Sequence, residues 1–346
     1  MSCEIPQTPA QAFKVMESML EGKYTTIEIV SFLRFFQENP ASPQLLFSFL
    51  EAVKASAVFT IDSNSFDKPV LDIAGTGGDG KNTVNISTLA GLFCAATGLV
   101  KVVKYGNRAA SGICGSMDVL EAHGIPIELS QEEMHENVRE HNFSPLFARS
   151  VYPGAKFVAE ARSQINGPTL FNLLFPLARP ITGQPKFVFG VANKNLLNII
   201  SEIYIQDKKT RCLLVHGIDE TDEVSVTGAG KTNYTLIDSG QMISGVIDCQ
   251  ELFDITPIGL SDLQVSSKQE AISLFKEVCD PQSQSPKLSA IRQAVFANAA
   301  VSLHVALDSG NMNVLNSNKY LPVLHEKLNS GKITKLLKSL QKKEIL

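Results

Sequence analysis

The chain has 346 residues, of which 44% are hydrophobic, so it is long enough for one large domain with a smaller companion. Its 31 basic and 35 acidic residues give a net charge of −4 without blocks of like charge, which argues against general nucleic-acid binding. The N-terminus lacks the segments of a signal peptide, and no uninterrupted apolar run approaches the length of a membrane span. We therefore expect a soluble, cytoplasmic protein that binds neither nucleic acid nor membrane.

Three helix-start signatures follow one another in the first 55 residues. Thr8-Pro9 and Ser42-Pro43 place a capping residue before a proline at the first helical position. Thr25-x-x-Glu28 forms a capping box. Apolar residues recur at helical spacing behind each signature, which predicts a small helical domain over residues 1–68.

From residue 70 the pattern changes to short apolar runs that alternate with helical segments. This alternation predicts an α/β domain with a mainly parallel central sheet wrapped by helices, over residues 69–165 and 183–346. A proline-bounded helical segment interrupts the rhythm, and we expect it to complete the helical domain over about 166–182. The expected strands are KPVLDIA, LVKVVKYG, IPIEL, KFVFGVA and RCLLVHG, and the expected helices cover 84–97, 130–141 and 193–205.

Six cysteines are scattered along the chain without a C-x-x-C pair or a histidine at metal-ligand spacing. Buried thiols in a reducing compartment are the simplest interpretation. They are Cys3, Cys94, Cys114, Cys212, Cys249 and Cys279.

A glycine-rich loop follows the first predicted strand. The segment Gly75–Gly80 contains four glycines in six residues, and a predicted helix begins shortly afterwards, near Asn85. Backbone amides of such a loop, together with the positive end of the helix, can bind a phosphate, although a tight turn is the plain alternative. Asp79 adds a carboxylate that suits a ribose hydroxyl or a metal ion.

A second polar loop follows the next predicted strand. Lys104 and Arg108 stand among small residues there and can neutralise a diphosphate, although each alone is more often a surface charge. Because both loops lie at carboxyl ends of predicted parallel strands, we expect one polyanionic ligand to span them.

Adjacent acids follow the predicted strand RCLLVHG. Asp222 and Glu223 offer the hard oxygen ligands that suit a diphosphate-bound Mg²⁺, whereas solvated loop acids are the ordinary alternative. The nearby Gly228–Thr232 imitates the end of a phosphate-binding P-loop, but a predicted strand follows it, so a turn is expected. His216 and His123 are expected to be structural.

Taken together, these motifs resemble those of the anthranilate phosphoribosyltransferase family of tryptophan biosynthesis. GTGGD followed by NIST, then K-x-GNR-x-x-S, GS-x-DVLEA, TLFNLL-x-PL and an Asp-Glu pair after VHG match that family in order and spacing over nearly the whole chain. The resemblance implies a transferase that moves the phosphoribosyl group of 5-phosphoribosyl 1-diphosphate to anthranilate with Mg²⁺ as cofactor. It also implies a homodimer formed through the helical domain.

The resemblance also assigns roles to individual residues. Lys104, Asn107 and Arg108 match catalytic positions, and Mg²⁺ matches Ser87, Asp222 and Glu223. Gly75, Asn107 and Arg162 match the anthranilate-binding positions, where the arginine faces the carboxylate. The positions that match binding of the diphosphate donor are Gly75, Gly78, Asp79, Thr83, Asn85, Ile86, Ser87, Thr88, Lys104, Asn107, Arg108, Ser111 and Ser116.

The chain departs from the family mainly around the acceptor. Tyr105, Tyr152 and Pro168 replace the usual residues of three acceptor-side motifs, and Phe175 replaces a glycine. A related enzyme with another aromatic acceptor or with nucleoside phosphorolysis is therefore an alternative, as is a non-catalytic paralogue that binds nucleic acid. The intact donor motifs and the acidic charge balance favour the anthranilate enzyme.

Overall fold

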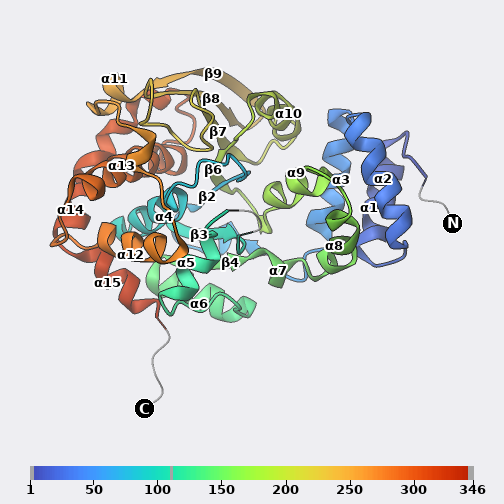
Figure 1. Cartoon of the computed structure of the whole chain (residues 1–346), viewed down its shortest axis with the longest axis horizontal. Coiled ribbons are helices and arrows are strands. Elements are labelled where there is room, and N and C mark those ends of the chain that lie inside the picture. Colours follow the sequence, from blue (N-terminus) through green and yellow to red (C-terminus); the bar gives the residue numbers. More distant parts are fainter. Residues whose placement is uncertain (1–3, 110–111, 342–346) are drawn as a thin grey trace, which may run out of the picture. The chain divides into compact units, whose positions relative to one another are not determined.

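The computed structural model describes residues 4–109 and 112–341 (Figure 1). The chain divides into two compact units. The helical unit comprises residues Met1–Ile61 and Ala148–Ile181, and the α/β unit comprises Asp62–Phe147 and Thr182–Leu346. Each unit is described by itself below.

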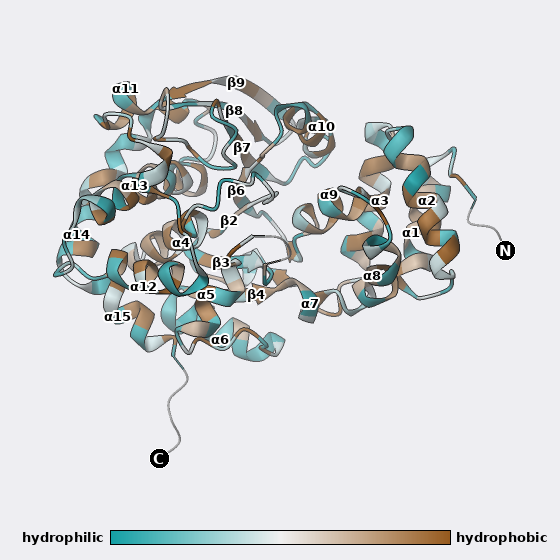
Figure 2. Ribbon diagram, in the orientation of Figure 1, coloured by the Kyte–Doolittle hydropathy of each residue, from teal (hydrophilic) through white to brown (hydrophobic). Residues whose placement is uncertain are grey.

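The helical unit begins with the three helices that the capping signatures predict. Thr8 and Thr25 form complete capping boxes, and the Ser42 side chain accepts a hydrogen bond from the Leu45 amide. Figure 2 shows hydrophobic and hydrophilic residues alternating along α1 and α2, as amphipathic helices require. The helices are α1 (Pro9–Leu20), α2 (Thr26–Glu38), α3 (Pro43–Ala55), α7 (Ala148–Val151), α8 (Lys156–Ser163) and α9 (Leu170–Leu177).

The second part of the helical unit starts earlier than expected. Residues 148–165 were predicted to belong to the α/β domain, but they belong to the helical unit, where α8 packs against α1 and α2. Val151, Tyr152 and Val158 are buried there. Apolar pairs such as Val151–Tyr152 and Phe157–Val158 are interspersed with charged residues in this segment. Because short amphipathic helices occur in both units, this pattern did not reveal which core the segment joins.

The α/β unit is built on a seven-stranded sheet with the order β4-β3-β2-β6-β7-β8-β9. Neighbouring strands from β4 to β7 are parallel, and β8 and β9 continue the sheet as antiparallel strands. The mainly parallel sheet confirms the predicted fold class. The strands are β2 (Val70–Gly75), β3 (Lys101–Gly106), β4 (Phe143–Phe147), β6 (Lys186–Gly190), β7 (Arg211–Gly217), β8 (Lys231–Asp238) and β9 (Gln241–Asp248); a separate two-stranded sheet pairs β1 (Ile61–Asp62) with β5 (Ile181–Thr182).

One predicted strand was wrong. The run IPIEL, residues 125–129, is a loop whose Ile125 and Ile127 are buried in the core. The strand next to β3 is instead β4, which contains Pro145. Because β4 is an edge strand, its proline does not need to donate to a further neighbour. The loop was predicted as a strand because its buried residues alternate, and β4 was not predicted because it contains a proline.

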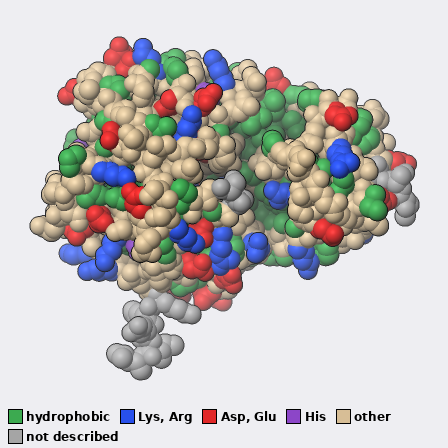
Figure 3. Space-filling view, viewed as in Figure 1, with side chains coloured by type: hydrophobic (Ala, Val, Ile, Leu, Met, Phe, Trp, Pro, Cys, Tyr) green, Lys and Arg blue, Asp and Glu red, His purple; other side chains and the backbone are tan. Residues whose placement is uncertain are grey.

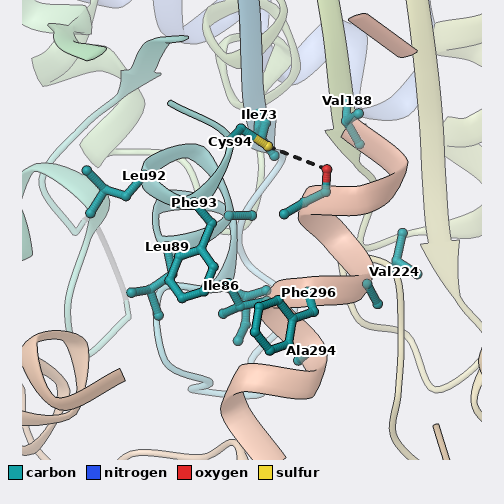
Figure 4. Close-up of a cluster of buried hydrophobic side chains, with 14 of the residues drawn as sticks. Ile73, Ile86, Leu89, Leu92, Phe93, Cys94, Val188, Val224, Ala294 and Phe296 are labelled. Atoms are coloured by element: carbon teal, nitrogen blue, oxygen red, sulfur yellow. Dashed lines mark hydrogen bonds between the residues drawn. The ribbon is translucent and has the colours of Figure 1, made fainter. Parts of the chain in front are cut away.

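The core of the α/β unit is centred on α13 (Pro286–Leu307). This helix is long and apolar enough to span a membrane, but 89% of its most apolar stretch is buried inside the fold, as expected for a core helix. It packs against α4 (Ile86–Thr97), where Phe93 meets Phe296 edge to face and the Cys94 thiol donates to the Ala299 carbonyl (Figure 4). The other helices are α5 (Ser116–Ala122), α6 (Gln131–His141), α10 (Lys194–Tyr204), α11 (Cys249–Phe253), α12 (Lys268–Cys279), α14 (Leu321–Asn329) and α15 (Lys332–Ser339).

The cysteines of the described residues are all free thiols, and all but the half-buried Cys114 are buried. Burial raises the pKa of Cys249 to about 11, so this thiol is protonated at neutral pH. Cys3 lies outside the described residues.

Candidate active site

The first glycine-rich loop starts where β2 ends at Gly75. Gly77, Gly78 and Gly80 have positive φ angles of 62°, 75° and 69°, a conformation that L side chains rarely adopt. A Cβ at any of these three positions would have no heavy atom within 4 Å. The glycines are therefore required by the backbone conformation rather than by crowding at their Cβ positions.

The predicted metal-binding acids lie directly against this loop. The Gly77 amide donates to Asp222 Oδ2 at 2.8 Å. A Cβ on Gly75 would lie 2.3 Å from the same oxygen, and a Cβ on Gly190 would lie 1.5 Å from the Asp222 carbonyl oxygen. Both glycines, at the ends of the neighbouring strands β2 and β6, are thus required by the close approach of Asp222. Asp222 and the glycine-rich loop thus lie at the same end of the sheet.

The acids of this site repel one another. Burial, followed by the charge of Asp79, raises the pKa of Asp222 to about 7. Burial and the charges of Asp222, Asp79 and Asp219 hold the pKa of Glu223 well above its usual range. A site that collects carboxylates in this way is stabilised by a divalent cation, so the donor set fits Mg²⁺.

The described residues contain no group of three or more His, Cys, Asp or Glu side chains that could hold a metal by itself. The pair of acids therefore needs further oxygens, which for Mg²⁺ are commonly waters and substrate phosphate. The third predicted ligand, Ser87, is half-buried in the first turn of α4. The assignment of Ser87 as a metal ligand stays a prediction.

Two polar side-chain atoms at the start of α4 are buried without a hydrogen-bond partner among the described residues. These atoms are Asn85 Oδ1 and Thr88 Oγ1. Buried polar atoms in folded proteins are usually paired, so two such atoms at one helix start indicate a ligand site. Asn85 Nδ2 donates to the Cys114 carbonyl at 2.9 Å and so links the first loop to the second. Of the other residues predicted here, Ile86 is buried in the core and Thr83 forms a bridge with Gln264.

The two predicted cations of the second loop are both engaged within the chain. Lys104 is buried in β3, and its Nζ donates to the Ile73 carbonyl of β2 at 2.5 Å. Arg108 pairs with Glu121 at 2.9 Å and Glu128 at 3.4 Å, and these acids raise its pKa. Arg108 must therefore exchange or share these partners when it contacts a diphosphate.

The second loop is closed by a residue to which the sequence analysis gave no role. Asp118, near the start of α5, accepts hydrogen bonds from the amides of Ala109 at 2.7 Å and Gly115 at 2.9 Å. The predicted Ser116 and Asn107 meet beside them, where Ser116 Oγ donates to the Asn107 carbonyl at 3.4 Å. The sequence indicates this role, because an acid at the third position of a helix can accept a hydrogen bond from a backbone amide at the helix N-terminus. The predicted Ser111 lies outside the described residues.

Arg162, predicted to bind the acceptor carboxylate, belongs to the helical unit. Its guanidinium carbon lies 5.9 Å and 5.8 Å from the ring centres of Phe171 and Phe175 on α9, and burial lowers its pKa. Tyr152 is buried in the same unit and donates from its hydroxyl to the Ala178 carbonyl at 2.6 Å. Tyr152 therefore fills the core of the helical unit rather than presenting a free hydroxyl.

The remaining motifs have structural roles. Gly228 and Gly230 adopt positive φ angles in a turn, and the strand β8 follows, so the resemblance of this segment to a P-loop ends there. His216 Nδ1 lies 2.7 Å from the Val191 carbonyl, and His123 stacks on Phe275. These contacts agree with the structural roles predicted for both histidines.

Comparison with known proteins decides the family. Residues 67–333, more than half of the chain, match the glycosyl transferase family a/b domain. The anthranilate phosphoribosyltransferase of Lactiplantibacillus plantarum is 33% identical over 294 residues, which cover 85% of this chain and 82% of the relative. That of Corynebacterium efficiens is 35% identical over 306 residues, which cover 87% and 85%. The chain belongs to the anthranilate phosphoribosyltransferase family.

Solved structures of anthranilate phosphoribosyltransferases share this fold. The enzyme of Thermus thermophilus superimposes with a TM-score of 0.83 at 28% identity, covering 98% of this chain and 95% of that one. The enzyme of Saccharomyces cerevisiae, solved in complex with PRPP and Mg, superimposes with a TM-score of 0.82 at 22% identity, covering 96% and 91%. The predictions of family and fold class are confirmed.

Proposed function

We propose that the chain transfers the phosphoribosyl group of 5-phosphoribosyl 1-diphosphate to anthranilate, giving N-(5-phosphoribosyl)anthranilate and diphosphate in tryptophan biosynthesis. Membership of the anthranilate phosphoribosyltransferase family supports this reaction. The observation that carries the proposal for this chain is the contact of Asp222 with the Gly77 amide, because it joins the acid pair to the glycine-rich loop. A diphosphate with its Mg²⁺ needs both groups at one place.

The metal is held by Asp222, Glu223 and Ser87 in this proposal. When bound, Mg²⁺ supplies positive charge that stabilises diphosphate as it leaves. The Gly78 amide binds a phosphate oxygen from the first loop, while the Gly77 amide keeps its hydrogen bond to Asp222. Lys104 is buried below this loop and contributes a fixed positive charge, which stabilises the leaving group without any movement of the side chain.

The chemistry is a substitution at the anomeric carbon of the ribose. A bond forms between the aryl amine nitrogen and this carbon, and the bond from the carbon to the diphosphate oxygen breaks with its electron pair. The amine then loses a proton to solvent or to diphosphate, so a strong base is not required. Arg162 and Asn107 orient the acceptor so that the amine attacks in line.

The aromatic surroundings of Arg162 support its role in binding the acceptor. The stacking of Arg162 on Phe171 and Phe175 holds a positive charge on an apolar surface, which suits an aromatic carboxylate. The Saccharomyces cerevisiae enzyme has also been solved in complex with 4-fluoroanthranilate. A different aromatic acid remains the second candidate acceptor, because Phe175 enlarges the aromatic surface beside Arg162.

We further propose that the protein acts in the cytoplasm as a homodimer formed through the helical unit. Ile27 and Phe35 support such an interface, because 77% and 37% of their surfaces are exposed on α2. Acidic and basic side chains are interspersed on the face shown in Figure 3, which favours a small-molecule enzyme over the alternative of a nucleic-acid-binding paralogue.

The deciding experiment follows anthranilate fluorescence with purified full-length protein, 5-phosphoribosyl 1-diphosphate and Mg²⁺. A loss of fluorescence that requires all three supports the reaction. If fluorescence stays constant while calorimetry detects binding of the donor with Mg²⁺, the donor half of the proposal stands and the acceptor is a different molecule. If neither fluorescence loss nor donor binding occurs, the proposed function is wrong.

A further inference from the structure

A short segment outside the predicted site contacts residues 81–84, which continue the first glycine-rich loop to the start of α4. The Val84 amide donates to the Leu263 carbonyl, and the Val265 amide donates to the Asn82 carbonyl, both at 2.9 Å. Between these two bonds, Gln264 Nε2 donates to the Lys81 carbonyl at 2.9 Å. Lys81, Asn82 and Val84 are thus hydrogen-bonded to three consecutive residues of this segment.

The same segment continues into α12 and contacts the second loop. Lys268, in the first turn of α12, donates from Nζ to Asp118 Oδ1 at 2.6 Å. The other oxygen of Asp118 accepts the amides of Ala109 and Gly115, which close the second loop. Burial raises the pKa of Asp118, but Lys268 and the two amides outweigh it and hold the pKa below its usual range. Lys268 therefore stabilises the carboxylate that closes the loop.

The segment is itself firmly held. Leu263 and Val265 are buried in the core of the α/β unit. Both the amide and the hydroxyl of Ser266 donate to Glu270 Oε2, and Lys287 donates to Glu270 Oε1 at 2.7 Å. Contacts with both loops and anchors in the core give this segment the properties of a support that holds the two loops in place.

We infer that residues 263–270, the brace, set the position of both donor-binding loops, with Gln264 and Lys268 as positioning residues for donor binding. Gln264 acts through the first loop, and Lys268 acts through Asp118 on the second. The inference rests on the proposed function, because it takes the two loops as the binding site of the diphosphate donor. Neither residue is assigned a contact with the substrate, so each acts only through the loop that it holds.

Two variants test the brace with little change in side-chain size. Gln264→Glu replaces the amide donor by a carboxylate that faces the Lys81 carbonyl, and Lys268→Met removes the charge that pairs with Asp118. The matched controls lie elsewhere in the α/β unit. Gln284→Glu alters a glutamine whose Nε2 donates to the Pro281 carbonyl at 2.9 Å, and Lys319→Met removes an ion pair with Asp308 of 2.8 Å.

Two readouts are measured on each full-length protein. Calorimetry gives the affinity for 5-phosphoribosyl 1-diphosphate with Mg²⁺, and hydrogen exchange followed by mass spectrometry gives the protection of each loop without ligand. We expect donor affinity to fall about fivefold in Gln264→Glu, as for a lost hydrogen bond. We expect a fall of about threefold in Lys268→Met, as for a partly exposed ion pair. We expect the KM for anthranilate to stay within twofold of its original value, because neither residue is assigned a contact with the acceptor.

Exchange should separate the two residues. Gln264→Glu should lower protection over residues 76–85, and Lys268→Met should lower it over 107–109 and 112–117. Lys268→Arg should keep the original protection and donor affinity. Unchanged exchange in both loops, or equal losses of donor affinity in the two controls, would overturn the inference. If the unaltered protein does not bind the donor at all, the proposed function fails, and the exchange measurements alone decide whether the brace exists.

Discussion

The two units of this chain prepare their ligand-binding residues in opposite ways. The α/β unit gathers carboxylates that repel one another, and burial and mutual charge raise the pKa values of Asp222 and Glu223. The helical unit holds the guanidinium of Arg162 against aromatic rings, where burial lowers its pKa. A bound metal cation offsets the repulsion between the carboxylates, and a bound anion offsets the buried positive charge of Arg162. This difference supports the proposed roles of Asp222 and Glu223 in holding the metal and of Arg162 in binding the acceptor carboxylate.

The largest expected effect comes from neutralising the acid pair. Turnover with Mg²⁺ should fall about a hundredfold or more in the Asp222→Asn, Glu223→Gln double variant, because the charge that stabilises diphosphate is no longer held in place. The fold should remain intact, and thermal unfolding without Mg²⁺ should occur at a higher temperature than in the original protein, because buried repulsive charges are gone. Fluorescence assays and thermal scans measure both quantities. Unchanged magnesium-dependent turnover would remove the proposed metal site.

The next effect concerns the cation of the helical unit. Arg162→Ala should raise the KM for anthranilate about tenfold to a hundredfold, because a charge-assisted pair with the carboxylate is lost. Donor affinity, measured by calorimetry, should stay the same. Arg34→Ala removes an exposed arginine of α2 in the same unit and serves as the control. If Arg162→Ala weakens the donor as much as it weakens anthranilate, the two units do not divide the substrates as we propose.

The three N-terminal helices and the glycine-rich loop could be predicted because their signals are local. Thr8, Thr25 and Ser42 cap the three N-terminal helices where the sequence places them, and the glycine-rich loop follows its strand as expected. Pairing over long distances is different. Neither Gln264 nor Lys268 lies in a recognisable motif, and each meets its loop only when residues about 150 or more positions away are brought together by the sheet. The edge strand β4 was missed for the related reason that its proline is harmless only at an edge.

A smaller effect follows from the pKa of Asp222. This carboxyl keeps its proton up to about pH 7 in the folded chain, whereas its ordinary pKa is 3.8, so its contribution to stability is complete below 3.8 and is lost as the pH rises through 7. Mg²⁺ binds the deprotonated form, so the metal must displace fewer protons at high pH. Mg²⁺ affinity, measured by calorimetry, should therefore rise about fivefold to tenfold between pH 6 and pH 8.

The control for this pH dependence is Asp222→Asn. The variant should bind Mg²⁺ weakly, and the remaining affinity should change less with pH than in the original protein. An equally steep rise in the variant would assign the titration to another group.

The smallest expected effect distinguishes packing from recognition in the helical unit. Tyr152 departs from the family, yet its buried hydroxyl donates to the Ala178 carbonyl at 2.6 Å and its ring lies 6.1 Å from that of Phe175. Tyr152→Phe keeps the ring and leaves the carbonyl without this donor, which should cost about 1 kcal/mol of stability. For a chain of this size, that loss corresponds to a fall of about 1–2 °C in Tm. The KM for anthranilate should not change, because the structure assigns the hydroxyl to the core. A higher KM at an unchanged Tm would instead make Tyr152 a residue that contacts the acceptor, and the chemistry of its hydroxyl would then select among aromatic acids.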